Sequence, residues 1–179
     1  MIFRTTPIGG VVVVEPERQE DARGFFARTF DANVFGEQGL DPAVAQMSTS
    51  FNVHMGTLRG MHFQAAPAEE VKLVRCTHGS IFDVALDLRE ASPTRLRWHG
   101  VELSAENGLA LFVPRGCGHG FQTLEPESEV LYVMSTPYVP GAGRGVRWDD
   151  PAFEIEWPDP PTGGRVMSDR DAGYGDFEV

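Results

Sequence analysis

Residues 81–88, Ile-Phe-Asp-Val-Ala-Leu-Asp-Leu, carry the pattern that decides the fold. The run alternates as a β-strand does, and Asp83 and Asp87, four residues apart, fall on one face of it. Similar runs occupy residues 11–14, 71–76, 109–113 and 130–135, the last with Val130, Tyr132 and Met134 on one face. The 20 glycines and 13 prolines are spread along the chain, as expected where turns separate many short strands. The sequence therefore predicts an all-β fold, a compact antiparallel barrel or jelly roll that encloses a pocket.

Helical signals are few. The run from Asp31 to Glu37 begins with an Asp cap and predicts a short helix, and the segment from Asp41 to Ala45 predicts one further turn. The tail from Pro158 to Val179 is rich in Pro, Gly and Asp, so we expect it to be irregular and held by packing. Without an internal repeat or a linker, residues 1–179 are expected to form one domain.

The overall charge and the cysteine count exclude several classes of protein. A formal net charge of −11 disfavours a general nucleic-acid binder, although one local anion pocket is compatible with it. The two cysteines, Cys76 and Cys117, are too few for a disulfide scaffold or a Cys-built zinc site. The chain has neither an apolar run of ~18 residues nor a leader cleavage pattern. We expect a soluble cytoplasmic protein without nucleic-acid or membrane partners.

Two histidine segments resemble the two halves of the cupin signature. In the first, Gly56 is followed by five residues and His62, with Glu69 further on; in the second, Gly108, Pro114, Gly116 and His119 have the cupin spacing. The second histidine of the cupin metal triad is replaced here by Gln64. An amide is a poor ligand for a transition metal. A pocket without metal, in which His62 is free to act as a base, is therefore favoured over a metal held by His62, Glu69 and His119.

A closer resemblance extends along nearly the whole chain, to the dTDP-4-dehydrorhamnose 3,5-epimerase family of cupins. The matching stretches are residues 21–26, 56–64, 72–75, 82–89, 92–94, 103–107, 114–121, Tyr132 with Tyr138, 148–151, 157–158 and 168–171. The family resemblance implies an epimerase of a nucleoside-diphosphate 4-keto-6-deoxy sugar, in deoxysugar biosynthesis, that inverts C3, C5 or both. Such a reaction removes a proton beside the C4 ketone, stabilises the enolate and returns a proton on the opposite face. It needs a base, an acid and a donor at the oxygen, and neither metal nor redox cofactor.

The resemblance also implies four catalytic roles. His62 is the base, and Asp171 is the carboxylate that orients it and fixes its tautomer. Lys72 stabilises the enolate oxygen. Tyr132, a phenol with a reference pKa of ~10, returns the proton from the other face.

Substrate recognition is implied by resemblance as well. The substrate is a nucleotide sugar, most simply a dTDP sugar, whose diphosphate needs cations such as Arg59 and Arg23. His119 and Tyr138 match positions that line the sugar pocket, and Arg170 matches a basic position beside the orienting carboxylate. The N-terminal segment is expected to cross to a partner subunit in a homodimer and to bring Arg23 and Phe26 to the partner's pocket.

Three positions depart from the family pattern. Arg28 replaces an acidic residue, and aligning back from Arg59 places Met47 and Thr49 where Gln and Asn normally stand. These positions bear on nucleotide recognition, so the base and the exact sugar stay open.

Two other functions remain as alternatives. One is a metal-dependent cupin enzyme, against which Gln64 argues, and the other is a sugar-binding cupin without catalysis. For Asp83 and Asp87 two interpretations also remain, a general-acid pair or plain ion pairs with Arg75 or Arg89.

Overall fold

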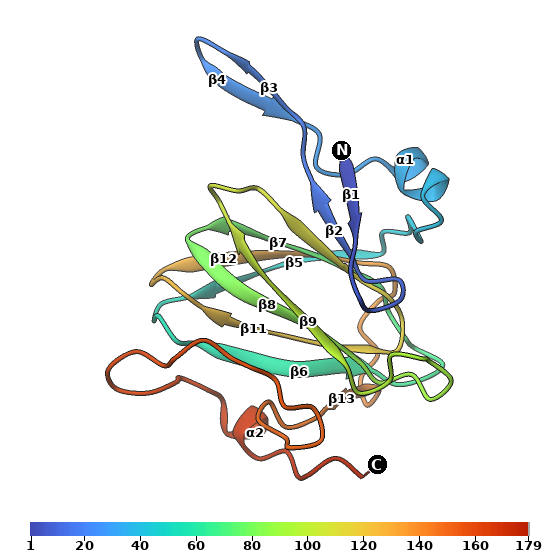
Figure 1. Cartoon of the computed structure of the whole chain (residues 1–179), viewed down its shortest axis with the longest axis vertical. Helices are drawn as coiled ribbons and strands as arrows, with labels where there is room; N and C mark the ends of the chain where they lie inside the picture. Colours follow the sequence, from blue (N-terminus) through green and yellow to red (C-terminus); the bar gives the residue numbers. More distant parts are fainter. Residues whose placement is uncertain (179) are drawn as a thin grey trace.

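Two antiparallel sheets face each other across the core in the computed structural model, which describes residues 1–178 (Figure 1). The six-stranded sheet has the order β1 (Ile2–Thr5), β2 (Val12–Glu15), β10 (Ala110–Val113), β7 (Lys72–His78), β12 (Ser128–Met134) and β5 (Gln46–Asn52). The five-stranded sheet has the order β13 (Gly143–Gly145), β6 (Leu58–Gln64), β11 (Cys117–Thr123), β8 (Ser80–Asp87) and β9 (Trp98–Ser104). This arrangement confirms the predicted all-β, jelly-roll class of fold.

A third, two-stranded unit stands apart from the sheets. It is the hairpin of β3 (Arg18–Asp21) and β4 (Gly24–Ala27), and it projects from the body of the molecule (Figure 1). Its side chains are mostly exposed, including those of Phe25 and Phe26.

Alternation along the strands distributes apolar side chains over three clusters. In β2 and the residue before it, Val11 and Val13 face the core between the sheets, whereas Val12 and Val14 face a second cluster with Phe35. In β8, Ile81 and Ala85 join the central core, while Val84 and Leu86 meet Phe153 of the C-terminal segment. Because both faces of these strands are covered, apolar side chains occupy both faces of each strand.

The two helices are short. The helix α1 (Ala32–Glu37) begins where predicted, since the Asp31 carboxylate accepts from the backbone N–H groups of Asn33 and Val34. In the tail, predicted to be irregular, Ser168 caps a further turn of helix, α2 (Asp169–Ala172). Among residues 1–178, none of the helices has the length and apolarity needed to span a bilayer.

The turn predicted for residues 41–45 does not form, and that prediction is wrong. The Asp41 carboxylate accepts from the Ala43 N–H at 3.0 Å and pairs with Arg115, while the Ala45 N–H donates to the Met134 carbonyl at 2.8 Å. Ala45 thus extends the ladder between β5 and β12, and the Ala43 N–H bonds to a side chain instead of to a helical carbonyl.

Candidate active site

A cavity of about 310 Å³ opens between the two sheets. Strands β5, β7 and β12 of the larger sheet and β6 and β11 of the smaller one contribute to its wall, which is lined by Ser48, Ser50, Arg59, His62, Glu70, Lys72, His119, Tyr132, Met134 and Tyr138. Six residues predicted to act in catalysis or substrate binding are therefore brought together here, from segments far apart in the chain. They are Arg59, His62, Lys72, His119, Tyr132 and Tyr138.

The imidazole of His62 on β6 is held by a carboxylate of the C-terminal tail. Its Nε2 lies 2.7 Å from Oδ1 of Asp171 on α2, which is buried. Burial opposes ionisation of Asp171, yet the bonds from His62, from the Gly60 N–H and from Ser168 hold the pKa of this carboxyl below its usual range. An ionised partner at Nε2 fixes the tautomer and leaves Nδ1 as the basic nitrogen.

The neighbouring strands β6 and β11 approach closely beside this pair. Gly60 has a φ of +148°, and a Cβ at this residue would lie 2.6 Å from the Cα of Gly120. Only glycine permits this approach. The Gly60 N–H also faces Oδ2 of Asp171 at 3.4 Å.

Lys72 supplies a buried cation at the start of β7. Its Nζ donates to the His62 carbonyl at 3.1 Å and lies 3.2 Å from Oε1 of Glu70. Burial lowers the pKa of Lys72, and the nearby carboxylates of Glu70 and Asp83 act in the opposite direction. An ammonium in this low-dielectric wall is suited to stabilising a developing oxyanion.

Tyr132 on β12 lies edge-on to the ring of His119, with the ring centroids 5.9 Å apart. Burial, and secondarily the charge of Asp83, raise the pKa of the Tyr132 phenol far above its usual range, so it stays a proton donor. Nε2 of the buried His119 lies 2.8 Å from Oδ1 of Asp83. The site thus contains a second imidazole–carboxylate pair that the sequence did not indicate.

The two aspartates of β8, Asp83 and Asp87, therefore have different ion-pair partners. Asp83 pairs with His119 and not with an arginine, whereas Asp87 pairs with Arg89 at 2.8 Å, one of the two partners expected for it. Neither finding fits a general-acid pair made by these two carboxylates.

Strand β5 presents a different face from the one that the alignment suggested. Ser48 and Ser50 line the cavity, and Ser48 is paired in register with Tyr132. Neighbouring residues on a strand point to opposite faces, so Met47 and Thr49 lie on the other face of the sheet. Met47 is 60% exposed there. The face of β5 that lines the cavity therefore carries Gln46, Ser48 and Ser50. The alignment that placed Met47 at a nucleotide-binding position was shifted by one residue.

Hydrogen bonds to neighbouring residues position Arg59 and Tyr138 at the cavity. The Arg59 Nε donates to Oδ1 of Asn52 at 2.8 Å, which leaves the rest of its guanidinium at the cavity. The Tyr138 N–H donates to Oε1 of Gln46 at 2.6 Å, while the Tyr138 side chain is 61% exposed. Gln46 was not singled out from the sequence, although its place in the alternation of β5 is a signal for it.

Four other predicted residues lie outside this cavity. Arg170 lines an adjoining hollow of about 200 Å³ that also includes His62 and Tyr138. Arg23 and Phe26 sit on the projecting hairpin, where Arg23 pairs with Asp21. Arg28 pairs with Asp31 at 2.9 Å beside α1. Within a single chain, then, the hairpin residues are separate from the cavity.

Other bonds engage Gln64 and two of the three ligands of the metal alternative, His62 and His119. Gln64 donates to the Ala68 carbonyl at 3.1 Å and accepts from the Val139 N–H at 2.8 Å. His62 and His119 each use one ring nitrogen on a carboxylate. Over residues 1–178, no three His, Cys, Asp or Glu side chains are grouped so that they could hold a metal ion.

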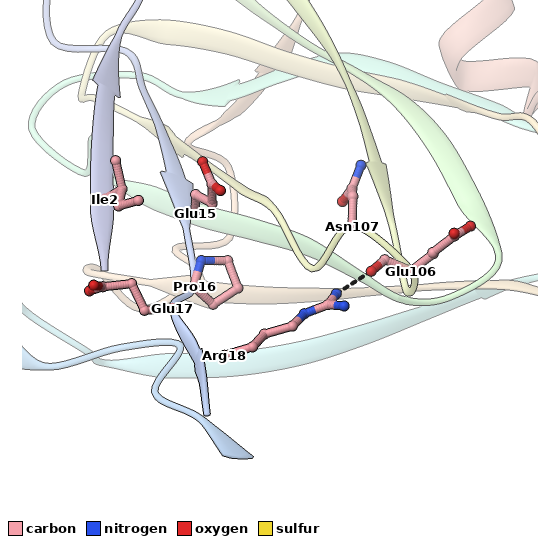
Figure 2. Close-up of a pocket in the computed structure, with 7 residues that line it drawn as sticks. All are labelled: Ile2, Glu15, Pro16, Glu17, Arg18, Glu106 and Asn107. Carbon is pink, nitrogen blue, oxygen red and sulfur yellow. Dashed lines mark hydrogen bonds between the residues drawn. The ribbon is translucent and has the colours of Figure 1, made fainter. Parts of the chain in front are cut away.

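A larger hollow, of about 540 Å³, lies at the base of the hairpin between β2 and the loop after β9. Figure 2 shows its lining, in which Arg18 reaches the backbone carbonyl of Glu106. Glu15, Glu17 and Glu106 belong to this lining, and Glu15 pairs with Arg4 while Glu17 pairs with the N-terminal amine. This lining contains neither an imidazole nor a lysine, so it lacks the base and the buried cation that line the first cavity.

A pocket between antiparallel sheets with an oriented imidazole, a buried ammonium and a buried phenol defines an acid–base enzyme of the cupin type. The model of the family described as dTDP-4-dehydrorhamnose 3,5-epimerase matches residues 5–178. A relative of that name from Sinorhizobium fredii is 41% identical over 172 residues, which is 96% of this chain and 87% of the relative.

Solved structures agree with the family match. The dTDP-4-dehydrorhamnose 3,5-epimerase of Elizabethkingia anophelis superposes with a TM-score of 0.94 at 35% identity, covering 99% of this chain and 96% of that one. The enzyme of that name from Bacillus anthracis, with TDP and PPi bound, gives 0.93 at 35% identity, with coverage of 98% and 99%. The chain belongs to the dTDP-4-dehydrorhamnose 3,5-epimerase family and is an isomerase of the epimerase class.

Proposed function

We propose that this enzyme epimerises a dTDP-linked 4-keto-6-deoxy sugar at C3, C5 or both. The observation that carries the proposal is the convergence of His62, Lys72 and Tyr132 on one cavity, with Asp171 bonded behind the imidazole. Membership of the family supports the same reaction, and the TDP bound to the Bacillus anthracis relative supports a thymidine nucleotide.

Each catalytic group has one task in the proposed reaction. His62 takes the proton from the carbon beside the C4 ketone, and Asp171 stabilises the imidazolium that forms. Lys72 stabilises the negative charge on the C4 oxygen of the enolate. Tyr132 then gives its proton to that carbon from the opposite face, which inverts the centre, and solvent restores both groups. No further cofactor enters this balance.

Arginines and hydroxyl groups hold the nucleotide in this proposal. Arg59, with Ser48 and Ser50, contacts the diphosphate, since these groups line one side of the cavity. His119 and Tyr138 line the sugar end, and Arg170 adds positive charge in the adjoining hollow.

The proposal includes a homodimer, with residues 1–179 as one domain whose N-terminal hairpin reaches the partner's cavity. The exposed Phe26 and the projection of the hairpin from the body support this arrangement (Figure 1). A cytoplasmic location also belongs to the proposal, and the two free, buried thiols Cys76 and Cys117 support it.

Solvent exchange tests the function directly. The purified enzyme is incubated in D₂O with 4-keto-6-deoxy sugars carried on thymidine, cytidine or guanosine diphosphate, and NMR locates the deuterium. We expect deuterium at C3, C5 or both, with inversion, fastest on the thymidine nucleotide. Tight binding without any deuterium uptake would instead identify a sugar-binding protein.

A further inference from the structure

Lys72 is the single lysine of the chain, whose other 14 basic residues are arginines. Its side chain is 10% exposed at the cavity wall. A lysine can lose its charge when buried, whereas an arginine cannot. The proposed role of Lys72 requires the charged form, so the groups that keep it charged matter for the reaction.

Glu70 is the direct counter-ion of this lysine. Its Oε1 lies 3.2 Å from Nζ, and its own side chain is also 10% exposed. Its Oε2 accepts from Nε2 of Gln64 at 3.0 Å, so the carboxylate is fixed from both sides. The Lys72 ammonium donates one N–H to the His62 carbonyl and forms an ion pair with Glu70 on another side. A third N–H is left for a group in the cavity.

Among residues 1–178, the other ionisable groups around Lys72 form no ion pair with its Nζ, although the Asp83 charge also favours the ammonium. These groups are Arg59 and His62 on β6, Asp83 on β8, His119 on β11 and Tyr132 on β12. Arg59 repels an ammonium, and the phenol of Tyr132 is neutral. The Asp83 carboxylate already accepts from His119 at 2.8 Å. Glu70 is the carboxylate that touches Nζ among residues 1–178.

We propose that Glu70 is a positioning residue for the epimerisation: it holds Lys72 as an ammonium and aims the remaining N–H at the substrate carbonyl oxygen. This inference rests on the role proposed for Lys72 above. Because burial alone lowers the pKa of Lys72, loss of the Glu70 charge is expected to lower it further.

The single lysine makes the test specific. In protein labelled with ¹³C at lysine Cε, one side-chain resonance reports the titration of Lys72. In Glu70→Gln, which keeps the size of the side chain but removes its charge, we expect the midpoint to fall by about one pH unit or more. The alkaline limb of the kcat profile should fall by the same amount, with kcat on the acid side retained. Glu70→Asp, which restores the charge, should move the midpoint back towards that of the wild type.

Glu69→Gln is the matched control, because it removes the same charge from the neighbouring residue, whose carboxylate lies beside the Gly116 turn. It should leave the Lys72 midpoint unchanged. An active Glu70→Gln variant with an unshifted midpoint would overturn the inference about Glu70. A shifted midpoint with an unshifted kcat profile would overturn it too, and would remove Lys72 from the chemistry. Absence of epimerisation by the wild type on every nucleotide sugar would instead refute the proposed function, while the Lys72 midpoint still reports on Glu70.

Discussion

His62 and Asp171 lie 109 positions apart in the chain, yet Nε2 of the imidazole and Oδ1 of the carboxylate are 2.7 Å apart. Two features of the tail bring them together. The Val166 N–H donates to the Gly56 carbonyl at 3.0 Å, and the Val166 carbonyl accepts from the Leu58 N–H at 2.9 Å. These two bonds attach the tail to the start of β6. Ser168 then caps the turn of helix that carries Asp171. The catalytic pair therefore depends on the docking of the tail.

Substitutions at this pair should differ in severity. We expect His62→Ala to abolish both deuterium exchange and product, because the other imidazole of the cavity, His119, is bonded to Asp83. Asp171→Asn keeps the shape but loses the charge, and should reduce kcat by ~10²–10⁴-fold. His54→Ala, at an exposed histidine, serves as the control. Exchange that persists in His62→Ala would show that another group is the base.

Tyr132→Phe should separate proton removal from inversion. The variant keeps the ring and its packing on His119 and loses only the hydroxyl. His62 still removes the proton, so the substrate should take up deuterium while inversion slows by ~10²–10⁴-fold. NMR of the sugar in D₂O measures both rates. Inversion at nearly the wild-type rate would point to another acid, with Tyr138 the first variant to test.

Activity should survive metal removal and need no added nicotinamide. Gln64 stands at the cupin metal position and bonds instead to the backbone of Ala68 and Val139. The assay compares the epimerisation rate before and after dialysis against EDTA. A rate that falls on chelation and returns with iron, nickel or zinc would support the metal-dependent alternative.

Two inactive variants should complement each other if the hairpin acts across the dimer. Light scattering should first show a homodimer. We expect Arg23→Ala and His62→Ala to be impaired separately. After mixed refolding, half of the dimers carry both subunit types, and each of these has one intact site, so about a quarter of the sites should recover. A fully active monomer, or no recovery on mixing, would contradict the exchange.

Asp87 should stabilise the fold in a pH-dependent way. It is buried, and although burial opposes its ionisation, bonds from Arg89, Ser92 and Thr94 hold the pKa of its carboxyl well below the usual range. Because the folded-state pKa is depressed, the Asp87 charge stabilises the fold fully above the unfolded-state pKa of ~3.9, and this stabilisation is lost progressively as the pH falls from that value through the folded-state pKa.

Asp87→Asn is therefore expected to lower the free energy of unfolding by about 3 kcal/mol at pH 7, and by about 1 kcal/mol less at pH 3, where the carboxyl is mostly protonated in the unfolded chain but still ionised in the fold. Urea unfolding at both pH values measures the difference. Asp149→Asn, at a half-exposed pair with Arg147, should cost about 0–1 kcal/mol. An equal effect of Asp87→Asn at both pH values would mean that its charge does not contribute.

Helices and strands that depend on local interactions could be predicted from the amino-acid sequence. Alternation in residues 81–88 and 130–135 placed β8 and β12, and the Asp31 cap placed α1. The spacing of the two histidine segments indicated the cupin signature, and the structure makes His62 and His119 register partners on the neighbouring strands β6 and β11. These features depend on side-chain period and on capping, which act within a few residues.

The orientation of β5, the pairing of β3 and the contacts between strands could be known only from the tertiary structure. Met47 and Ser48 differ by one position, and a one-residue change of register moves every side chain of β5 to the other face. The four polar residues of β3 carry no strand signal and pair only with β4. The bonds of Asp83 to His119 and of Glu70 to Lys72 depend on which strands become neighbours. That choice follows from burying three apolar clusters at once, a property of the whole chain that no local pattern encodes.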